Sequence, residues 1–238
     1  MRATIHLTAQ SNCKYSTDYE HKLRGVFYNA LQDSKPELHS SHQQIPFTFS
    51  NIYPPEEIIS EGDTKKLTFA SYDDEIFFTV LSEISNSQVT VGEMIFRVNE
   101  ISIHNTNVSQ RGSLSTPNGV YCEVPSDREH PTYWKPNHGL NSFKEQIEST
   151  LDWKIDTYTT HSSEERNFPI FNSYELIKQY SRPYTVETSQ QLTFVLSKWK
   201  LDYDLENSLH RSYINIALDT GLGKKNTLGL GFVNQDSH

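Results

Sequence analysis

The C-terminal part of the chain contains a glycine-rich segment, residues 221–232, which reads GLGKKNTLGLGF. Two Gly-Leu-Gly units flank a short loop that carries two adjacent lysines. Glycine adopts positive φ readily and lets another backbone come close, and exposed N–H groups beside lysine side chains can hold an anion. The segment therefore predicts contact with phosphate or an RNA backbone. The residues assigned to this contact are Gly221, Gly223, Lys224, Lys225, Gly229 and Gly231.

The residues before the glycine-rich segment predict a helix that leads directly into it. Apolar residues recur with helical spacing over residues 205–217. Gly221 is therefore also explained as a helix C-cap, with the rest of the segment as a glycine-kinked hairpin. We favour phosphate contact because four glycines in two matched pairs around lysines exceed what one cap requires. A final strand is expected over residues 228–233.

The length and composition bound the class of protein. A chain of 238 residues is long enough for two domains of about 110–120 residues. Its two cysteines, Cys13 and Cys122, imply no disulfide framework, and no Cys/His spacing suggests a zinc site. The sequence shows neither the apolar core of a signal peptide nor an apolar run of about 18 residues that would cross a bilayer. We therefore expect a soluble, cytoplasmic protein with no membrane partner.

The charge distribution is uneven. A net charge of −9 argues mildly against nucleic-acid binding, because such domains are usually basic. Local clusters decide the potential that a ligand meets, however, and the C-terminal segment is less acidic than the rest. Its basic residues are Lys198, Lys200, Arg211, Lys224 and Lys225.

The first half of the chain alternates strand and helix patterns. Thr17 and Glu20 form a capping-box pair, and an apolar stripe follows that predicts a helix ending near Gln32. Tyr28 lies off this stripe. The other expected elements are strands at residues 1–8, 46–50 and 91–103, a hairpin of 66–72 with 75–81, and a weak helix within 83–90.

The second half repeats this order after a polar junction at residues 104–119. Expected there are strands at 120–124 and 186–201, a helix at 139–152, and the helix and strand around the glycine-rich segment. Two such halves predict an α+β fold of two tandem ferredoxin-like (RRM-like) domains, with antiparallel sheets and helices on one face. The expected domains are residues 1–111 and 112–238.

Several motifs together resemble the Cas6 endoribonucleases, which belong to the RAMP superfamily of CRISPR-associated proteins and cut precursor CRISPR RNA within its repeats. The glycine-rich segment is similar to the family's C-terminal loop. Residues 23–31, LRGVFYNAL, resemble the family's LxGxIYNAI helix, and Leu38-His39 before PFTFS at 46–50 resembles its LH…PFTFS block. Residues 114–117 resemble the short segment that opens the family's second domain, and residues 143–154 resemble the helix that follows it.

The resemblance implies a catalytic histidine at His39. His42 is a rival in the same stretch, but Leu38 precedes His39 and its distance to Phe47 fits the family without a gap. Tyr28 matches an aromatic position that assists catalysis in some members, although a half-buried packing tyrosine explains it equally well. Some members place a lysine before the FTFS strand, where this chain has Ile45 and Pro46, so no assisting lysine is assigned.

The implied reaction is metal-independent RNA cleavage. Histidine suits general acid and base roles because its unperturbed pKa, about 6.5, lies near working pH. Attack by the 2′-OH leaves a 2′,3′-cyclic phosphate and a 5′-OH, and no cofactor or metal is expected. The implied partner is CRISPR repeat RNA, and the resemblance also allows a CRISPR interference complex or a homodimer. Two alternatives stay open: a non-catalytic CRISPR-RNA-binding RAMP protein, and an unrelated phosphate- or nucleotide-binding module.

Overall fold

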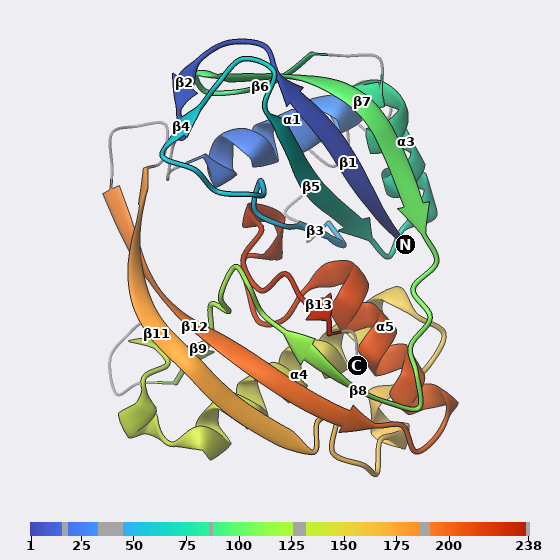
Figure 1. Cartoon of the computed structure of the whole chain (residues 1–238). Coiled ribbons are helices and arrows are strands. Elements are labelled where there is room, and N and C mark those ends of the chain that lie inside the picture. The colour runs from blue at the N-terminus through green and yellow to red at the C-terminus, as the bar shows by residue number, and fades with distance from the viewer. Residues whose placement is uncertain (16–18, 33–44, 86–87, 126–131, 186–190, 237–238) are drawn as a thin grey trace. The chain divides into compact units, whose positions relative to one another are not determined.

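The structure is a computed structural model that describes residues 1–15, 19–32, 45–85, 88–125, 132–185 and 191–236 (Figure 1). The chain divides into two compact units. Unit 1 comprises Met1–Asn105 with Thr227–Gly229, and unit 2 comprises Thr106–Asn226 with Leu230–His238. This division lies a few residues before the expected boundary at 111, and it groups a short piece of the glycine-rich segment with unit 1.

Unit 1 is built on a five-stranded antiparallel sheet with the strand order β3-β5-β1-β7-β6. Helices α1 and α3 lie side by side on one face of this sheet (Figure 1). The sequence β1-α1-β3-β5-α3-β7 is the βαββαβ order of a ferredoxin-like domain, with β6 added at the edge. The elements are β1 (Arg2–Ala9), β2 (Cys13–Lys14), α1 (Glu20–Gln32), β3 (Phe47–Phe49), β4 (Ile58–Ile59), β5 (Thr64–Ser71), α3 (Asp74–Ser85), β6 (Gln88–Val91) and β7 (Met94–His104).

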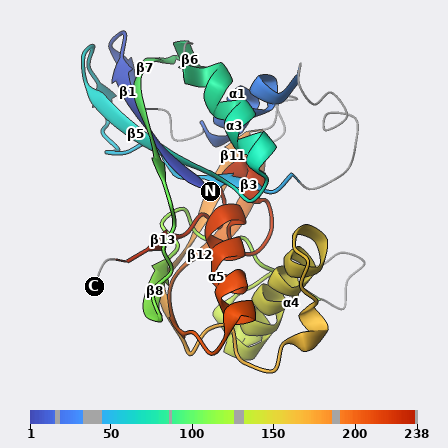
Figure 2. The same ribbon diagram turned by 90° about the vertical axis from the view of Figure 1, so that its right-hand side faces the viewer.

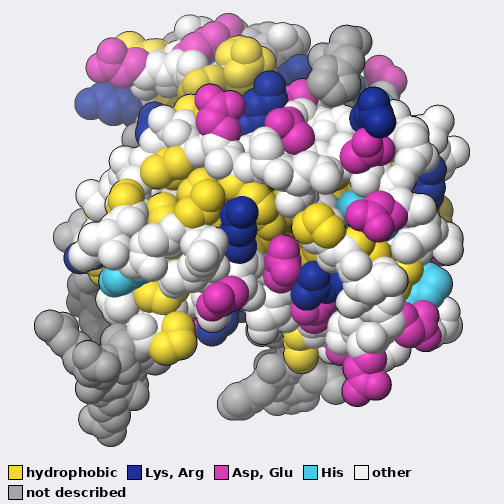
Figure 3. Space-filling model, turned by 90° about the horizontal axis from the view of Figure 1, so that it is seen from below, with side chains coloured by type: hydrophobic (Ala, Val, Ile, Leu, Met, Phe, Trp, Pro, Cys, Tyr) yellow, Lys and Arg dark blue, Asp and Glu magenta, His cyan; other side chains and the backbone are white. Residues whose placement is uncertain are grey.

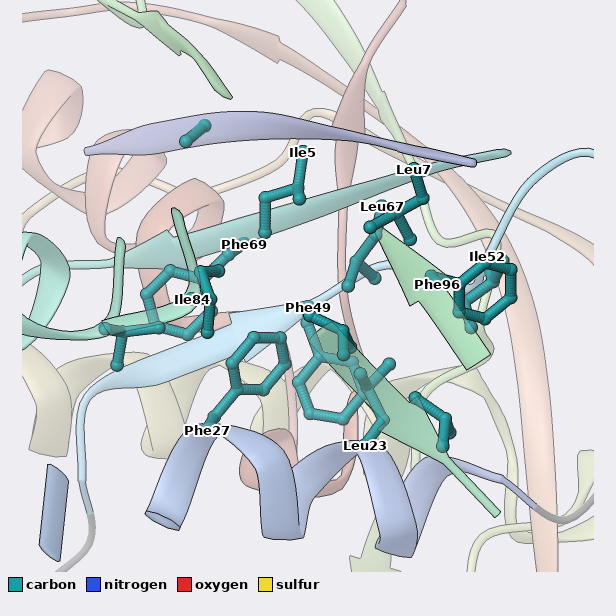
Figure 4. Packing of buried hydrophobic residues seen from close by; sticks show 14 of the residues in the cluster. Ile5, Leu7, Leu23, Phe27, Phe49, Ile52, Leu67, Phe69, Ile84 and Phe96 are labelled. Carbon is teal, nitrogen blue, oxygen red and sulfur yellow. The ribbon is translucent and has the colours of Figure 1, made fainter. Parts of the chain in front are cut away.

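The core of unit 1 is an aromatic cluster between α1 and the sheet. The predicted apolar stripe of α1 is confirmed, since Leu23, Phe27 and Leu31 are buried along it. The ring of Phe27 lies 5.1 Å from that of Phe49 and 4.8 Å from that of Phe69, measured between centroids (Figure 4). The helix is therefore held by the burial of large apolar side chains, which is the main favourable term in folding.

Residues 75–81 form part of helix α3, so the expected hairpin with 66–72 is wrong. Asp73 caps this helix, because its carboxylate accepts the N–H of Ile76 at 2.9 Å. The buried residues of α3 recur with helical rather than strand spacing: Ile76, Phe77, Val80, Leu81 and Ile84. The weak helix expected within 83–90 is instead the end of α3 and the start of β6, and the expected strand at 91–103 is interrupted by a turn at Gly92 with φ of +66°.

Unit 2 repeats the same topology. Its four-stranded sheet has the order β11-β12-β8-β13 with antiparallel neighbours, and β8-α4-β11-β12-α5-β13 is a second βαββαβ unit. Helices α4 and α5 lie side by side against one face of this sheet (Figure 2). The elements are β8 (Arg111–Ser115), β9 (Glu123–Val124), β10 (Thr132–Tyr133), α4 (Leu140–Tyr158), β11 (Ser173–Thr185), β12 (Gln191–Asp204), α5 (Ser208–Thr220) and β13 (Asn234–Gln235), with short 3-10 turns at Pro136–His138, Ser163–Glu165 and Asn226–Leu228.

The strand predictions in unit 2 need several corrections. Strands β8 and β11 are absent from the sequence-based expectations: β8 lies within the expected polar junction at 104–119, and β11 pairs with β12 along most of its length. The final strand is β13 and not residues 228–233, because Gly229 and Gly231 adopt positive φ. Within 120–124, β9 covers Glu123–Val124, while Val120 and Tyr121 form isolated bridges. The helix expected at 139–152 continues to Tyr158, and none of the described helices is long and apolar enough to cross a membrane.

Replacement of Phe27 by Ala should destabilise the protein strongly, because it leaves a cavity among packed aromatic rings. We expect a loss of about 3–5 kcal/mol in the free energy of unfolding, measured by urea denaturation. Phe78→Ala is the matched control on α3, since Phe78 is 52% exposed, and it should cost less than about 1 kcal/mol. Equal losses in the two variants would contradict this description of the core.

Candidate functional site

The glycine-rich segment begins at the C-terminal end of α5. Gly221 is the C-cap residue of this helix, with φ of 81°, and its N–H donates to the carbonyl oxygen of Ala217 at 2.8 Å. The C-terminal end of a helix carries partial negative charge and several carbonyl oxygens without helical partners. The segment therefore starts at a place that favours cations and hydrogen-bond donors.

The glycines of the segment pack against the protein's own backbone. A Cβ atom at Gly223 would lie 2.5 Å from the carbonyl oxygen of Tyr121, and one at Gly231 would overlap the carbonyl oxygen of Leu222. Both glycines also have positive φ, 66° and 72°. The close backbone approach that these glycines permit is therefore internal to the chain.

The N–H groups of the segment also have acceptors within the chain. Leu222 N donates to Gly231 O at 2.8 Å, Lys224 N donates to Tyr121 O at 3.0 Å, and Gly231 N donates to Gly119 O at 2.7 Å. An N–H group that is already hydrogen-bonded is not available to an anion. The expected anion cradle is therefore not formed by these three groups, and the lysine side chains are the basic groups that the segment presents.

Both lysines of the segment are exposed. Lys224 Nζ lies 2.6 Å from Glu123 Oε2. Burial raises the pKa of the Glu123 carboxyl, but the hydrogen bond and charge of Lys224 outweigh it and leave this pKa below its ordinary value. The ion pair lies at the surface, with 45% of the Lys224 side chain and 20% of the Glu123 side chain exposed. Surface ion pairs contribute up to about 1 kcal/mol, so Lys224 can exchange this carboxylate for a phosphate. Lys225 adopts φ of 62°, a left-handed conformation that is uncommon for residues other than glycine.

A buried lysine on α4 donates hydrogen bonds to two residues of the segment. Lys154 of α4 is only 3% exposed, and its Nζ lies 2.7 Å from Gly221 O and 2.8 Å from Asn226 Oδ1, with a longer contact of 3.5 Å to Thr220 O. Burial lowers the pKa of Lys154 from its ordinary value of 10.5 to about 7. The carbonyl acceptors at the negative end of α5 favour the charged form and oppose this shift. The sequence reasoning missed Lys154, because it stands among the apolar residues of a helix with no local signal of a partner.

Tyr28 is half-buried on α1. Its ring lies 5.8 Å from that of Phe47 on β3 in an edge-to-face arrangement, and the guanidinium of Arg24 lies 4.5 Å above its centroid. Ile45, which stands where some family members have a lysine, is buried in the core of unit 1. The predicted catalytic residues His39 and His42 lie outside the described residues.

Three cations and a tyrosine on strands β11 and β12 form a second candidate surface, here called the cationic strip: Lys178, Arg182, Lys198 and Tyr180. Lys178 and Lys198 face each other across the two strands, and both ammonium groups lie over the Tyr180 ring, 5.4 and 5.8 Å from its centroid. Burial, and then the charges of Lys178 and Arg182, lower the pKa of Lys198. Like charges at facing positions destabilise a sheet, so an anion bound here would relieve their repulsion. The alternation of Lys178, Tyr180 and Arg182 would have revealed this surface had β11 been predicted.

The overall charge does not identify a binding surface. On the face shown in Figure 3, basic and acidic side chains are interspersed around a band of hydrophobic side chains. The potential that an anionic ligand meets depends on local groups. The lysines of the glycine-rich segment and the cationic strip are therefore the two local candidates for anion contact.

Two comparisons of the sequence with known proteins point to the same family. Residues 102–235 match the family described as CRISPR associated protein Cas6, C-terminal. A CRISPR-associated endoribonuclease Cas6 from Haloferax mediterranei is 37% identical over 252 residues, which cover 98% of this chain and 93% of that protein.

Solved structures confirm the predicted fold class. A structure described as CRISPR associated protein Cas6 has a TM-score of 0.77 at 18% identity, covering 100% of this chain and 99% of the other. Another, described as a RAMP protein binding different RNA substrates, has a TM-score of 0.76 at 17% identity and covers 100% of both chains.

Because the pKa of Lys154 is lowered in the folded protein, we expect the free energy of unfolding to depend on pH. Between about pH 7 and 10.5 the unfolded chain binds a proton at Lys154 that the folded chain has lost, so the unfolding free energy should rise with pH by up to about 1.4 kcal/mol per unit. Lys154→Met lacks this contribution. Urea denaturation of both proteins at about pH 7.5 and about pH 9 should show the wild type gaining stability relative to the variant. If the difference in unfolding free energy between the wild type and Lys154→Met is the same at both pH values, Lys154 has an ordinary pKa in the folded protein.

Proposed function

Because this chain belongs to the Cas6 family of CRISPR-associated endoribonucleases, we propose that it cleaves precursor CRISPR RNA within its repeats by metal-independent attack of a 2′-OH. The observation that carries the proposal is the similarity to a Cas6 endoribonuclease over nearly the whole length of both chains. The glycine-rich segment, with its two exposed lysines, supports the RNA contact.

The proposed reaction is an internal transfer at phosphorus. A general base removes the proton of the 2′-OH, and the oxygen forms a bond to the adjacent phosphorus. The bond from phosphorus to the 5′-oxygen then breaks, and a general acid protonates the departing oxygen. The products are a 2′,3′-cyclic phosphate and a 5′-OH, and the need for a 2′-OH restricts the reaction to RNA.

His39 is the proposed acid or base, and His42 is its alternative. Both stand between α1, which ends at Gln32, and β3, which begins at Phe47. Tyr28 lies on α1 and packs against Phe47, so it joins the two elements that this stretch of chain connects. The Tyr28 hydroxyl is proposed to orient the 2′-OH or the scissile phosphate.

CRISPR repeat RNA is the proposed partner, bound through its phosphates by Lys224 and Lys225 and by the cationic strip. Basic side chains that neutralise phosphates give affinity that falls with salt. Membership of a CRISPR interference complex and formation of a homodimer stay predictions from the family resemblance.

Cleavage of the host's CRISPR repeat RNA in excess EDTA tests the proposed chemistry. The unmodified RNA should be cut, and a copy with a 2′-deoxy group at the cut site should be bound but not cut. His39→Ala should lower the cleavage rate by at least about 100-fold, the range expected for loss of general acid–base catalysis, with RNA affinity retained. His42→Ala is the matched control.

Each outcome of this test bears on the assignment. A large loss in His42→Ala alone would move the catalytic role to His42. Equal rates for both variants and the wild type would contradict a histidine mechanism. Tight binding of the unmodified RNA without cleavage would favour the non-catalytic RNA-binding alternative.

The number of neutralised phosphates follows from the salt dependence of binding. With the 2′-deoxy RNA as a non-cleavable probe, Lys224→Ala with Lys225→Ala should reduce the slope of log affinity against log salt. The reduction should be about 0.7 for each single-strand phosphate that is no longer neutralised. Lys178→Ala with Lys198→Ala tests the cationic strip in the same way.

An unchanged slope would remove the substituted pair from the RNA-binding surface. Lys22→Ala is the control, because Lys22 is an exposed lysine of α1 outside both surfaces. Its salt slope should equal that of the wild type.

A further inference from the structure

Asn226 lies at the centre of the glycine-rich segment and uses its whole side-chain amide there. Its Nδ2 donates to the carbonyl oxygens of Leu222 and Leu230, each at 2.9 Å, and its Oδ1 accepts from Lys154 at 2.8 Å. Leu222 precedes Asn226 by four residues and Leu230 follows it by four, so one side chain ties the two arms of the segment together.

The outer glycines make room for this amide. A Cβ atom at Gly221, and likewise one at Gly231, would lie 2.9 Å from Asn226 Nδ2. The backbone also joins the two arms, since the N–H of Leu222, the residue after Gly221, donates to Gly231 O. The paired glycines therefore shape a closed loop around the amide of Asn226.

Lys154 anchors this arrangement to α4. Its Nζ is buried, and the oxygens that accept hydrogen bonds from it are the Asn226 amide oxygen and the carbonyl oxygens of Thr220 and Gly221 at the end of α5. Buried N–H donors without these acceptors would carry a large desolvation cost. The loop shape that supplies them is thereby favoured over more open shapes.

We infer that Lys154 and Asn226, here called the Lys154–Asn226 clamp, are positioning residues that hold the glycine-rich segment in the shape in which its lysines contact RNA; this inference rests on the proposed function. The clamp adjoins the lysines directly, because Asn226 follows Lys225 in the chain. Lys224 is held on the other side by its backbone hydrogen bond to Tyr121. Lys154 itself is buried and does not reach the RNA.

The sharpest test is Asn226→Asp, which has nearly the same shape. The carboxylate keeps an acceptor for Lys154 but removes both donors and places negative charge beside two carbonyl oxygens. We expect the affinity for the non-cleavable 2′-deoxy repeat RNA to fall about tenfold or more, with a salt slope reduced by about 0.7 for each lysine that no longer reaches a phosphate. Lys154→Met should act in the same direction, because it removes the Nζ donor to Gly221 O and Asn226 Oδ1.

Thr220→Val is the matched control. The buried Thr220 hydroxyl donates to Ile216 O at 2.6 Å, at the same end of α5, whereas the contact of Thr220 with Lys154 is made by its backbone carbonyl oxygen, which the substitution keeps. This variant removes a buried hydrogen bond of comparable cost, so it reports the effect of general destabilisation. Its RNA affinity and salt slope should stay within about twofold of the wild type. Thermal unfolding first identifies a temperature at which every variant is folded, and Asn226→Asp carries the test if Lys154→Met does not fold.

The outcomes separate this inference from the proposed function. If the wild type cleaves repeat RNA, and Asn226→Asp keeps the affinity and salt slope of Thr220→Val, the clamp does not position the lysines and the inference is wrong. The same follows if Lys224→Ala with Lys225→Ala leaves the wild-type slope unchanged. If the wild type neither binds nor cleaves repeat RNA, the proposed function fails and the inference fails with it.

Discussion

The shape of the C-terminal segment depends on one buried lysine side chain. Lys154 reaches from α4 to the last carbonyls of α5 and to the amide oxygen of Asn226. The carbonyl oxygens at the end of a helix need hydrogen-bond donors, and the burial of Lys154 Nζ makes the loss of these hydrogen bonds costly. This interaction joins both helices of unit 2 to the loop that follows α5.

The two units have the same topology. In each, two helices cover one face of an antiparallel sheet whose strands follow the βαββαβ order. The apolar faces differ in detail: unit 1 packs Phe27 among phenylalanines of its sheet, while unit 2 stacks Phe143 of α4 on Trp199 of β12 at 4.0 Å. The same architecture therefore accommodates two cores with different aromatic packing.

Helices and strands with a clear apolar periodicity can be predicted from the sequence, and those without one cannot. Helices α1 and α5 are predictable because their apolar stripes have clear helical spacing. The strand prediction for residues 75–81 is wrong, because a short apolar run does not distinguish helix from strand and the capping residue Asp73 is equally typical of a turn. Strand β11 escapes prediction because much of it is exposed and carries polar side chains, which breaks the apolar alternation of a half-buried strand.

The family, the tandem fold and the glycine-rich segment with its two lysines can be recognised from the amino-acid sequence, because each depends on local patterns and motifs. The residues that the glycines contact and those that hold the segment in place are known only from the three-dimensional structure. Tyr121 and Lys154 stand about 100 and 70 residues from the segment they contact, and the cations of β11 and β12 meet through strand register. Such partners are chosen by packing and hydrogen bonding in three dimensions, which residue spacing along the chain does not record.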